Sequence, residues 1–172
     1  ADGLLSTFSS LLRIAQIESG NRRAGFTQLD LRIILLDVIE LYEPLATDKN
    51  ITFRSSLEQN LTINGDRDLL FQAFANLVDN AIKYTPEAGL VTVDLAVSKQ
   101  QALVTIADSG PGISLDEAEK VFGRFYRVEA SRSQYPGNGL GLSLVSAVVK
   151  LHDGTILLAE NDPGLRVDVR LP

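Results

Sequence analysis

Apolar residues recur at two characteristic spacings along this chain, and the spacings separate expected helices from expected strands. Spacings of three and four predict helices over 4–19, 31–45, 66–84 and 139–151. Alternation predicts strands over 51–57, 61–64, 91–98, 102–107, 155–159 and 165–171, with a hairpin turn around Lys99–Gln101. Ser114–Glu117 has the form of a capping box and predicts a short helix, while Arg127–Asn138 has no periodicity and predicts a loop. This order predicts an α/β sandwich in which helices cover one face of a mixed sheet.

The segment before residue 26 stands apart from the rest. Gly20 ends its helix, whose apolar stripe consists of Leu4, Leu5, Phe8, Leu11, Leu12 and Ala15. A helix with such a stripe must pack on something, which favours a packing face over a membrane anchor. The polar break that follows predicts a helical segment over 1–20, a linker over 21–25 and a domain over 26–172.

Composition narrows the function classes. The 172 residues include 16 Lys and Arg against 22 Asp and Glu, and the net charge of −6 argues against general binding to nucleic acid or acidic membranes. There is no Cys and a single His, which excludes disulfides, thiol nucleophiles and multi-histidine zinc sites. No apolar run reaches the roughly 18–20 residues of a membrane span. The absence of Met predicts a fragment or a processed product.

The helix expected over 66–84 carries a polar stripe beside its apolar face. The residues expected to face the sheet are Leu70, Phe74, Leu77, Val78 and Ala81. Asn76, Asn80 and Lys83 stand at i, i+4 and i+7, and so stack two amides and an ammonium along one side. Amide oxygens suit Mg²⁺ and an ammonium suits phosphate, although the same stripe is also typical of a solvated helix face.

Two glycine-containing segments are the other candidates for chemistry. Asp108–Ile113 follows an expected strand, where a carboxylate can accept from an exocyclic amine and glycines let the backbone approach a flat ring. An ordinary turn has the same composition. Gly137–Leu142 opens a helix, and its backbone N–H groups can face an anion. Its glycine spacing fits neither a dinucleotide-binding fingerprint nor a Walker A loop.

Four ordered motifs now carry a family resemblance. They are N-L-V-D-N-A-I-K-Y-T-P (76–86), D-S-G-P-G-I (108–113), F-G-R-F-Y-R (122–127) and G-N-G-L-G-L-S-L-V (137–145). They resemble the N, G1, F and G2 boxes of the ATP-binding domain of sensor histidine kinases, in the gyrase–Hsp90–histidine kinase–MutL superfamily. The resemblance covers 26–172 and implies a Bergerat-type α/β sandwich with a mostly antiparallel sheet. It also implies Mg²⁺ with ATP or ADP, and a cytoplasmic segment of a parent protein anchored in the inner membrane.

The resemblance gives each matching residue a role. Asn80 would coordinate Mg²⁺ with Asn76 beside it, and Lys83 would approach the phosphates. Tyr84 would lie near the nucleotide, and Asp108 would accept the adenine amino group. The remaining implied residues are Gly110, Gly112 and Ile113 at the base, Phe122 and Phe125 as lid anchors, Arg127 and Arg132 at the phosphates, and Gly137, Gly139, Leu140, Gly141 and Leu142 in the phosphate loop.

Asn76 separates reaction classes within the superfamily. The hydrolytic relatives and the serine-directed anti-sigma kinases are similar to one another in placing a Glu base at this position. An amide cannot activate water or a hydroxyl, whereas a neutral imidazole is already a nucleophile. Phosphoryl transfer to histidine needs positioning and charge neutralisation, which Asn76, Asn80, Lys83 and Arg127 would supply. The alternatives are a hydrolytic ATPase of the same superfamily and a degenerate interaction module.

The phosphoacceptor histidine of the family stands in an H-E motif on a dimerisation hairpin, and this chain has no such motif. Residues 4–20 resemble the end of that hairpin's second helix. The resemblance therefore places the acceptor upstream, on a domain through which two copies could pair, with a response regulator aspartate receiving the phosphoryl group next. His152 precedes Asp153-Gly154, and we expect it to complement the negative end of the last helix while Gly154 supplies the C-cap conformation.

Overall fold

The computed structural model describes residues 2–19, 23, 25–111, 141–161 and 163–172. Its helices are α1 (Asp2–Glu18), α2 (Leu31–Asp48), α3 (Arg67–Tyr84) and α5 (Gly141–Leu151). Its strands are β1 (Thr27–Asp30), β2 (Thr52–Leu57), β3 (Thr62–Gly65), β4 (Leu90–Ser98), β5 (Gln101–Asp108), β6 (Thr155–Glu160) and β7 (Leu165–Leu171). The helices expected over 66–84 and 31–45 and the strands after residue 51 are thus confirmed within a few residues. The expected capping-box helix and the loop over 127–138 lie outside the described residues.

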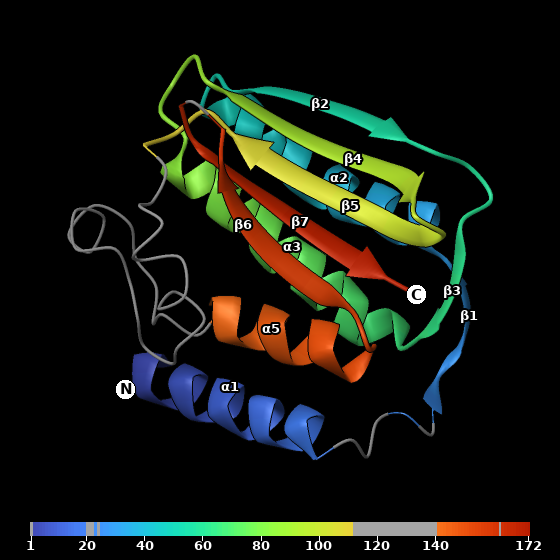
Figure 1. Cartoon of the computed structure of the whole chain (residues 1–172). Helices are drawn as coiled ribbons and strands as arrows, with labels where there is room; N and C mark the ends of the chain where they lie inside the picture. Colours follow the sequence, from blue (N-terminus) through green and yellow to red (C-terminus); the bar gives the residue numbers. More distant parts are fainter. Residues whose placement is uncertain (1, 20–22, 24, 112–140, 162) are drawn as a thin grey trace.

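Five strands form the main sheet in the order β2-β4-β5-β7-β6. β2 is parallel to β4, and every other pair in this sheet is antiparallel. β1 and β3 form a separate antiparallel pair. The helices α2, α3 and α5 lie on one face of the main sheet (Figure 1). α1 packs against α5, on the side of α5 that is turned away from the sheet. The predicted α/β sandwich with one covered face is confirmed.

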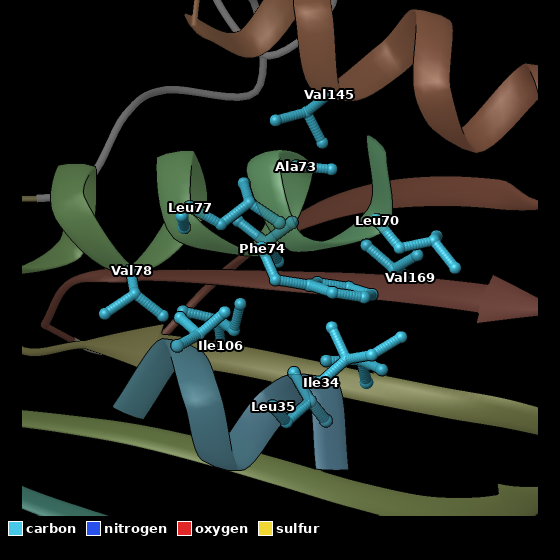
Figure 2. Packing of buried hydrophobic residues seen from close by; sticks show 14 of the residues in the cluster. Ile34, Leu35, Leu70, Ala73, Phe74, Leu77, Val78, Ile106, Val145 and Val169 are labelled. Carbon is cyan, nitrogen blue, oxygen red and sulfur yellow. The ribbon is translucent and has the colours of Figure 1, made fainter. Parts of the chain in front are cut away.

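The core lies between this sheet and its helices. Strand alternation points one side of each strand toward the helices, as with Val91, Val93 and Leu95 of β4, which are at most 2% exposed. Phe74 of α3 points toward the sheet among Ile106 and the other labelled side chains (Figure 2). Burying each such side chain contributes about 1.5–3 kcal/mol. The packing fixes α3 against β5, and these two elements carry the residues expected to bind a ligand.

Two elements differ from the sequence prediction. β1 was not predicted, because its four residues show no buried alternation and two of them are exposed. The second helix was expected to end at residue 45 but continues to Asp48 through Pro44. Pro44 and Glu40 both lie on the exposed side of α2, where water can satisfy the carbonyl that a proline leaves unbonded.

The predicted packing stripe of α1 is only partly confirmed where side chains are described, since Leu11 packs against the core but other members of the stripe do not. Phe8 is 59% exposed and Leu12 is 49% exposed, whereas Ile14 and Ile17 are buried in the common core. Ile17 stands nine residues after Phe8 and therefore on the opposite side of the helix. The stripe was misread because both sides of this helix carry apolar residues. None of the helices in the described part of the chain combines the length and apolar character needed to span a bilayer.

Candidate functional site

The candidate site lies at one end of the sandwich, where α3 and β5 end and α5 begins (Figure 1). α3 and α5 pack against each other in opposite directions, because Asp66 just before α3 contacts His152 just after α5. The end of α3 therefore lies beside the start of α5. Asn76, Asn80, Lys83, Tyr84, Asp108, Gly110, Gly141 and Leu142 are among the described residues. The other expected site residues lie outside them: Gly112, Ile113, Phe122, Phe125, Arg127, Arg132, Gly137, Gly139 and Leu140.

The polar stripe of α3 is partly exposed beside a buried apolar face. Asn76 and Asn80 are half-buried one turn apart, while the neighbouring Leu77 is buried. Lys83 pairs with Asp79 of the same helix, with 2.8 Å between Nζ and Oδ2. Since the Lys83 side chain is 38% exposed, this ion pair is weak, and an anion of higher charge can compete for the ammonium.

The end of α3 is held in place by bonds from outside the last turn. The Nζ of Lys49 donates to the carbonyl oxygens of Ile82 and Lys83, each at 3.0 Å. Desolvation lowers the pKa of Lys49. Thr85, which is fully buried, donates from Oγ1 to the carbonyl oxygen of Ala81 at 2.7 Å. These bonds satisfy carbonyls that a helix end leaves open, and they fix the backbone that carries Lys83 and Tyr84.

Asp108 is a buried carboxylate at the end of β5. The alternation of β5 places it on the same side as Val104 and Ile106, toward the helices. Its Oδ1 accepts from the backbone N–H of Gly110 at 2.9 Å and of Leu165 at 3.2 Å. Burial raises the pKa of Asp108, and these two hydrogen bonds oppose the rise. Both donors meet the same oxygen, and no other described residue donates to the carboxylate.

Gly110 brings the end of β5 against the end of α3. A Cβ at this position would overlap the carbonyl oxygen of Tyr84, so any larger residue would push the two ends apart. The neighbouring Ser109 pairs with Leu90, accepting on Oγ from the Leu90 N–H at 2.9 Å and donating its own N–H at 3.1 Å. Tight backbone contact therefore sets the distance between Asp108 and the polar stripe of α3.

The turn between β6 and β7 also contacts Asp108, and the sequence did not predict this contact. Asn161 donates from Nδ2 to the carbonyl oxygen of Asp108 at 2.7 Å, and Leu165 bonds the carboxylate as described above. Gly164 has φ of 113°, and a Cβ there would overlap the Asp108 carbonyl oxygen. The signal in the sequence is weak, because it consists of one polar and one glycine residue in a short turn. The contact becomes visible only when β7 is known to pair with β5.

The start of α5 completes this end of the molecule. α5 begins at Gly141, and Leu142 packs partly buried against the core. Ser143 is buried in the first turn at 7% exposure. The first N–H groups of a helix have no partner within the helix, and they attract negative charge.

His152 has a structural role that differs in detail from the predicted one. It is 4% exposed, its Nδ1 donates to the carbonyl oxygen of Val148 at 2.7 Å, and its Nε2 accepts from the Asp66 N–H at 3.0 Å. The ring complements the helix end as a neutral donor rather than as a cation, because burial lowers its pKa. The C-cap conformation is adopted by Asp153, with φ of 57°, instead of Gly154. Gly154 closes the motif by donating to the Val149 carbonyl oxygen at 2.9 Å.

Comparison with known proteins agrees with this geometry. Residues 65–172 match the family described as histidine kinase-, DNA gyrase B- and HSP90-like ATPase. The sensor-like histidine kinase SenX3 of Mycobacterium tuberculosis is 34% identical over 157 residues, which cover 91% of this chain and 38% of SenX3. The kinase BaeS of Escherichia coli is 37% identical over 126 residues, which cover 72% of this chain and 27% of BaeS. The chain thus spans less than two fifths of these relatives.

Solved structures give the same result for the fold. The nucleotide-free catalytic domain of histidine kinase ThkA superposes with a TM-score of 0.77 at 28% identity, covering 86% of this chain and 97% of that one. Full-length ShkA in complex with AMPPNP superposes with a TM-score of 0.81 at 28% identity, covering 99% of this chain and 36% of that one. The chain therefore belongs to the histidine kinase-, DNA gyrase B- and HSP90-like ATPase family, as an ATP-binding catalytic domain of the sensor histidine kinase branch.

Proposed function

We propose that this domain binds Mg-ATP and transfers the γ-phosphoryl group to a histidine on a dimerisation domain, for relay to a response regulator aspartate. The observation that carries the proposal is the convergence of a buried carboxylate, two amides, an ammonium and a helix N-terminus at one end of the sandwich. Asp108 would accept from the adenine amino group, and the start of α5 would donate backbone N–H groups to the phosphates. The similar kinase ShkA was solved in complex with AMPPNP, which supports an adenine nucleotide as the ligand of this domain.

The donor set fits a magnesium ion held mainly by the nucleotide. Within the described residues no cluster of three carboxylate or imidazole side chains could hold a metal. Mg²⁺ commonly takes one or two protein oxygens and completes its shell with phosphate oxygens and water, which suits the amide oxygen of Asn80 with Asn76 beside it. Mg²⁺, when bound, neutralises charge on the phosphates. Lys83 would exchange its ion pair with Asp79 for the same phosphates.

The residues of this chain favour transfer to an acceptor elsewhere. Asn76 offers no carboxylate base for activating water. His152 is buried with both ring nitrogens in hydrogen bonds, so its imidazole cannot attack a phosphorus atom. Residues 1–20 would belong to the dimerisation hairpin, 21–25 to a linker and 26–172 to the nucleotide domain. The exposed Phe8 and Leu12 would then be available for pairing with a second copy, and the solved complex of kinase ThkA with response regulator protein TrrA supports the relay.

The transfer is tested with radiolabelled ATP and a separately supplied dimerisation domain. We expect acid-labile, alkali-stable phosphate on the supplied domain and none on this chain, because a phosphohistidine has that stability and His152 is inaccessible. Steady release of inorganic phosphate without any acceptor would instead support the hydrolytic ATPase. Calorimetry that detects no adenine nucleotide binding would contradict both enzymes and favour the interaction module.

Asn80→Ala should weaken ATP binding by about tenfold in Mg²⁺, because one metal ligand is lost, and should change it far less in EDTA. Calorimetry under the two conditions makes the measurement. Gln72→Ala is the matched control, since it removes an amide from the same stripe of α3 about 12 Å away along the helix. An equal loss with and without Mg²⁺ would contradict the metal role of Asn80.

A further inference from the structure

The turn between β6 and β7 reaches back to a residue more than fifty positions earlier. Asn161 closes its own turn through its backbone, whose N–H donates to the Gly164 carbonyl oxygen at 3.0 Å. Its side chain is therefore not needed for that closure. The side chain instead donates from Nδ2 to the main-chain oxygen of Asp108 at 2.7 Å.

The same turn also contacts the carboxylate of Asp108. The N–H of Leu165 donates to Oδ1 at 3.2 Å, beside the bond from Gly110. Gly164 lies so close to the Asp108 backbone that a Cβ would overlap its carbonyl oxygen. Asp108 is thus held at both ends, by the Asn161 amide on its carbonyl and by backbone N–H groups on Oδ1. None of the described residues donates to its other carboxylate oxygen, Oδ2, and we assign this oxygen to the ligand.

We propose that Asn161 is a positioning residue for Asp108, and that the β6–β7 turn sets how well the site distinguishes a purine with a 6-amino group from one without it. The inference rests on the proposed function, since it assigns the reading of the base to Asp108. A hydrogen bond depends steeply on angle, so a carboxylate of fixed orientation selects a ligand N–H better than a mobile one. Asn161 acts only through Asp108 and does not itself touch the ligand.

The experiment compares ATP with purine riboside triphosphate, which lacks the 6-amino group, by calorimetry on the same protein. The wild type should bind ATP more tightly than the analogue. Asn161→Ala should weaken ATP binding by about threefold to tenfold, the worth of one neutral hydrogen bond, and leave the analogue unchanged. Because Asn161 is exposed, the variant should fold. Glu160→Ala, an exposed neighbour at the end of β6, is the matched control and should leave both affinities as in the wild type.

A second variant separates positioning from a general effect on the fold. In an Asp108→Asn background, Asn161→Ala should cause no further loss of discrimination, because the group that it positions is already changed. Equal weakening of ATP and analogue by Asn161→Ala, or an unchanged ratio, would overturn the positioning role while leaving the proposed function intact. A wild type that binds neither nucleotide would overturn the proposed function, and the inference with it.

Discussion

Asp108→Asn is expected to weaken ATP binding by about tenfold to 150-fold while leaving the unliganded protein at least as stable as before. The carboxylate loses its charge, and an amide nitrogen can replace the oxygen that faces the adenine amino group. A hydrogen bond to a charged acceptor contributes about 1.5–3 kcal/mol, which sets this range of affinity. Calorimetry with Mg-ATP measures the affinity, and urea unfolding at pH 7 measures the free energy of unfolding.

The expected stability of the Asp108→Asn protein follows from the pKa of Asp108 in the wild type. Burial raises that pKa in the folded state, so the folded protein holds the proton to a higher pH than the unfolded chain does. The free energy of unfolding therefore falls as pH rises from the unfolded to the folded pKa, and the cost persists at neutral pH. An amide removes this cost and can still accept from Gly110 and Leu165. ATP affinity of the wild type should in turn fall as pH is lowered through the raised pKa.

Asp94→Asn is the matched control for Asp108→Asn. Desolvation also raises the pKa of Asp94, but this residue lies on the open face of β4, opposite Thr105. Because Asp94 is less buried than Asp108, its replacement should relieve a smaller burial cost, and it should not change ATP affinity. Loss of ATP affinity in both variants would contradict a specific role of Asp108 in binding. A strongly destabilised Asp108→Asn protein would contradict the expectation that the buried charge costs stability.

The sequence predicted those parts of the fold in which apolar spacing follows burial. β4, β5 and α3 have one buried side and one exposed side, so their spacing gave their type and limits. α1 was predicted as a helix, but its packing face was only partly predicted: Leu11 packs on the core, whereas Phe8 is exposed and Ile17, on the opposite side, is buried. Spacing identifies an apolar side, but it cannot choose between two such sides when the partner helix is unknown.

The residues of the candidate site likewise fall into those that the sequence predicts and those that it does not. The motifs around Asn80 and Asp108 are short runs of chain, so the order of motifs along the sequence was enough to expect them. The contact from Asn161 to Asp108 joins positions 53 residues apart, and it exists because β7 lies between β5 and β6 in the sheet. Strand order is a property of the whole fold, and no local sequence pattern predicts it.

His152 holds three parts of the chain together at the end opposite the candidate site: the segment before β1, the junction of β3 and α3, and the end of α5. Its ring stacks on Phe26 with 4.6 Å between centroids, and its nearest atoms lie 2.7 Å from the place that a Cβ on Gly65 would take. It also bonds the Val148 carbonyl and the Asp66 N–H, and Asp66 caps α3 by accepting from the Leu69 N–H at 3.0 Å. Loss of the ring would leave a buried donor, a buried acceptor and a cavity together.

His152→Ala should therefore lower the free energy of unfolding by about 3–5 kcal/mol at pH 7.5, as measured by urea unfolding. Burial lowers the pKa of His152, so the unfolded chain binds the proton first, and wild-type stability should fall as pH drops below about 6.5. The variant should lose that part of the pH dependence. Asp153→Asn removes the exposed ion pair with Arg23 but leaves the ring of His152 in place, and it should cost at most about 1 kcal/mol. Equal costs in the two variants would show that the ring does not hold this junction.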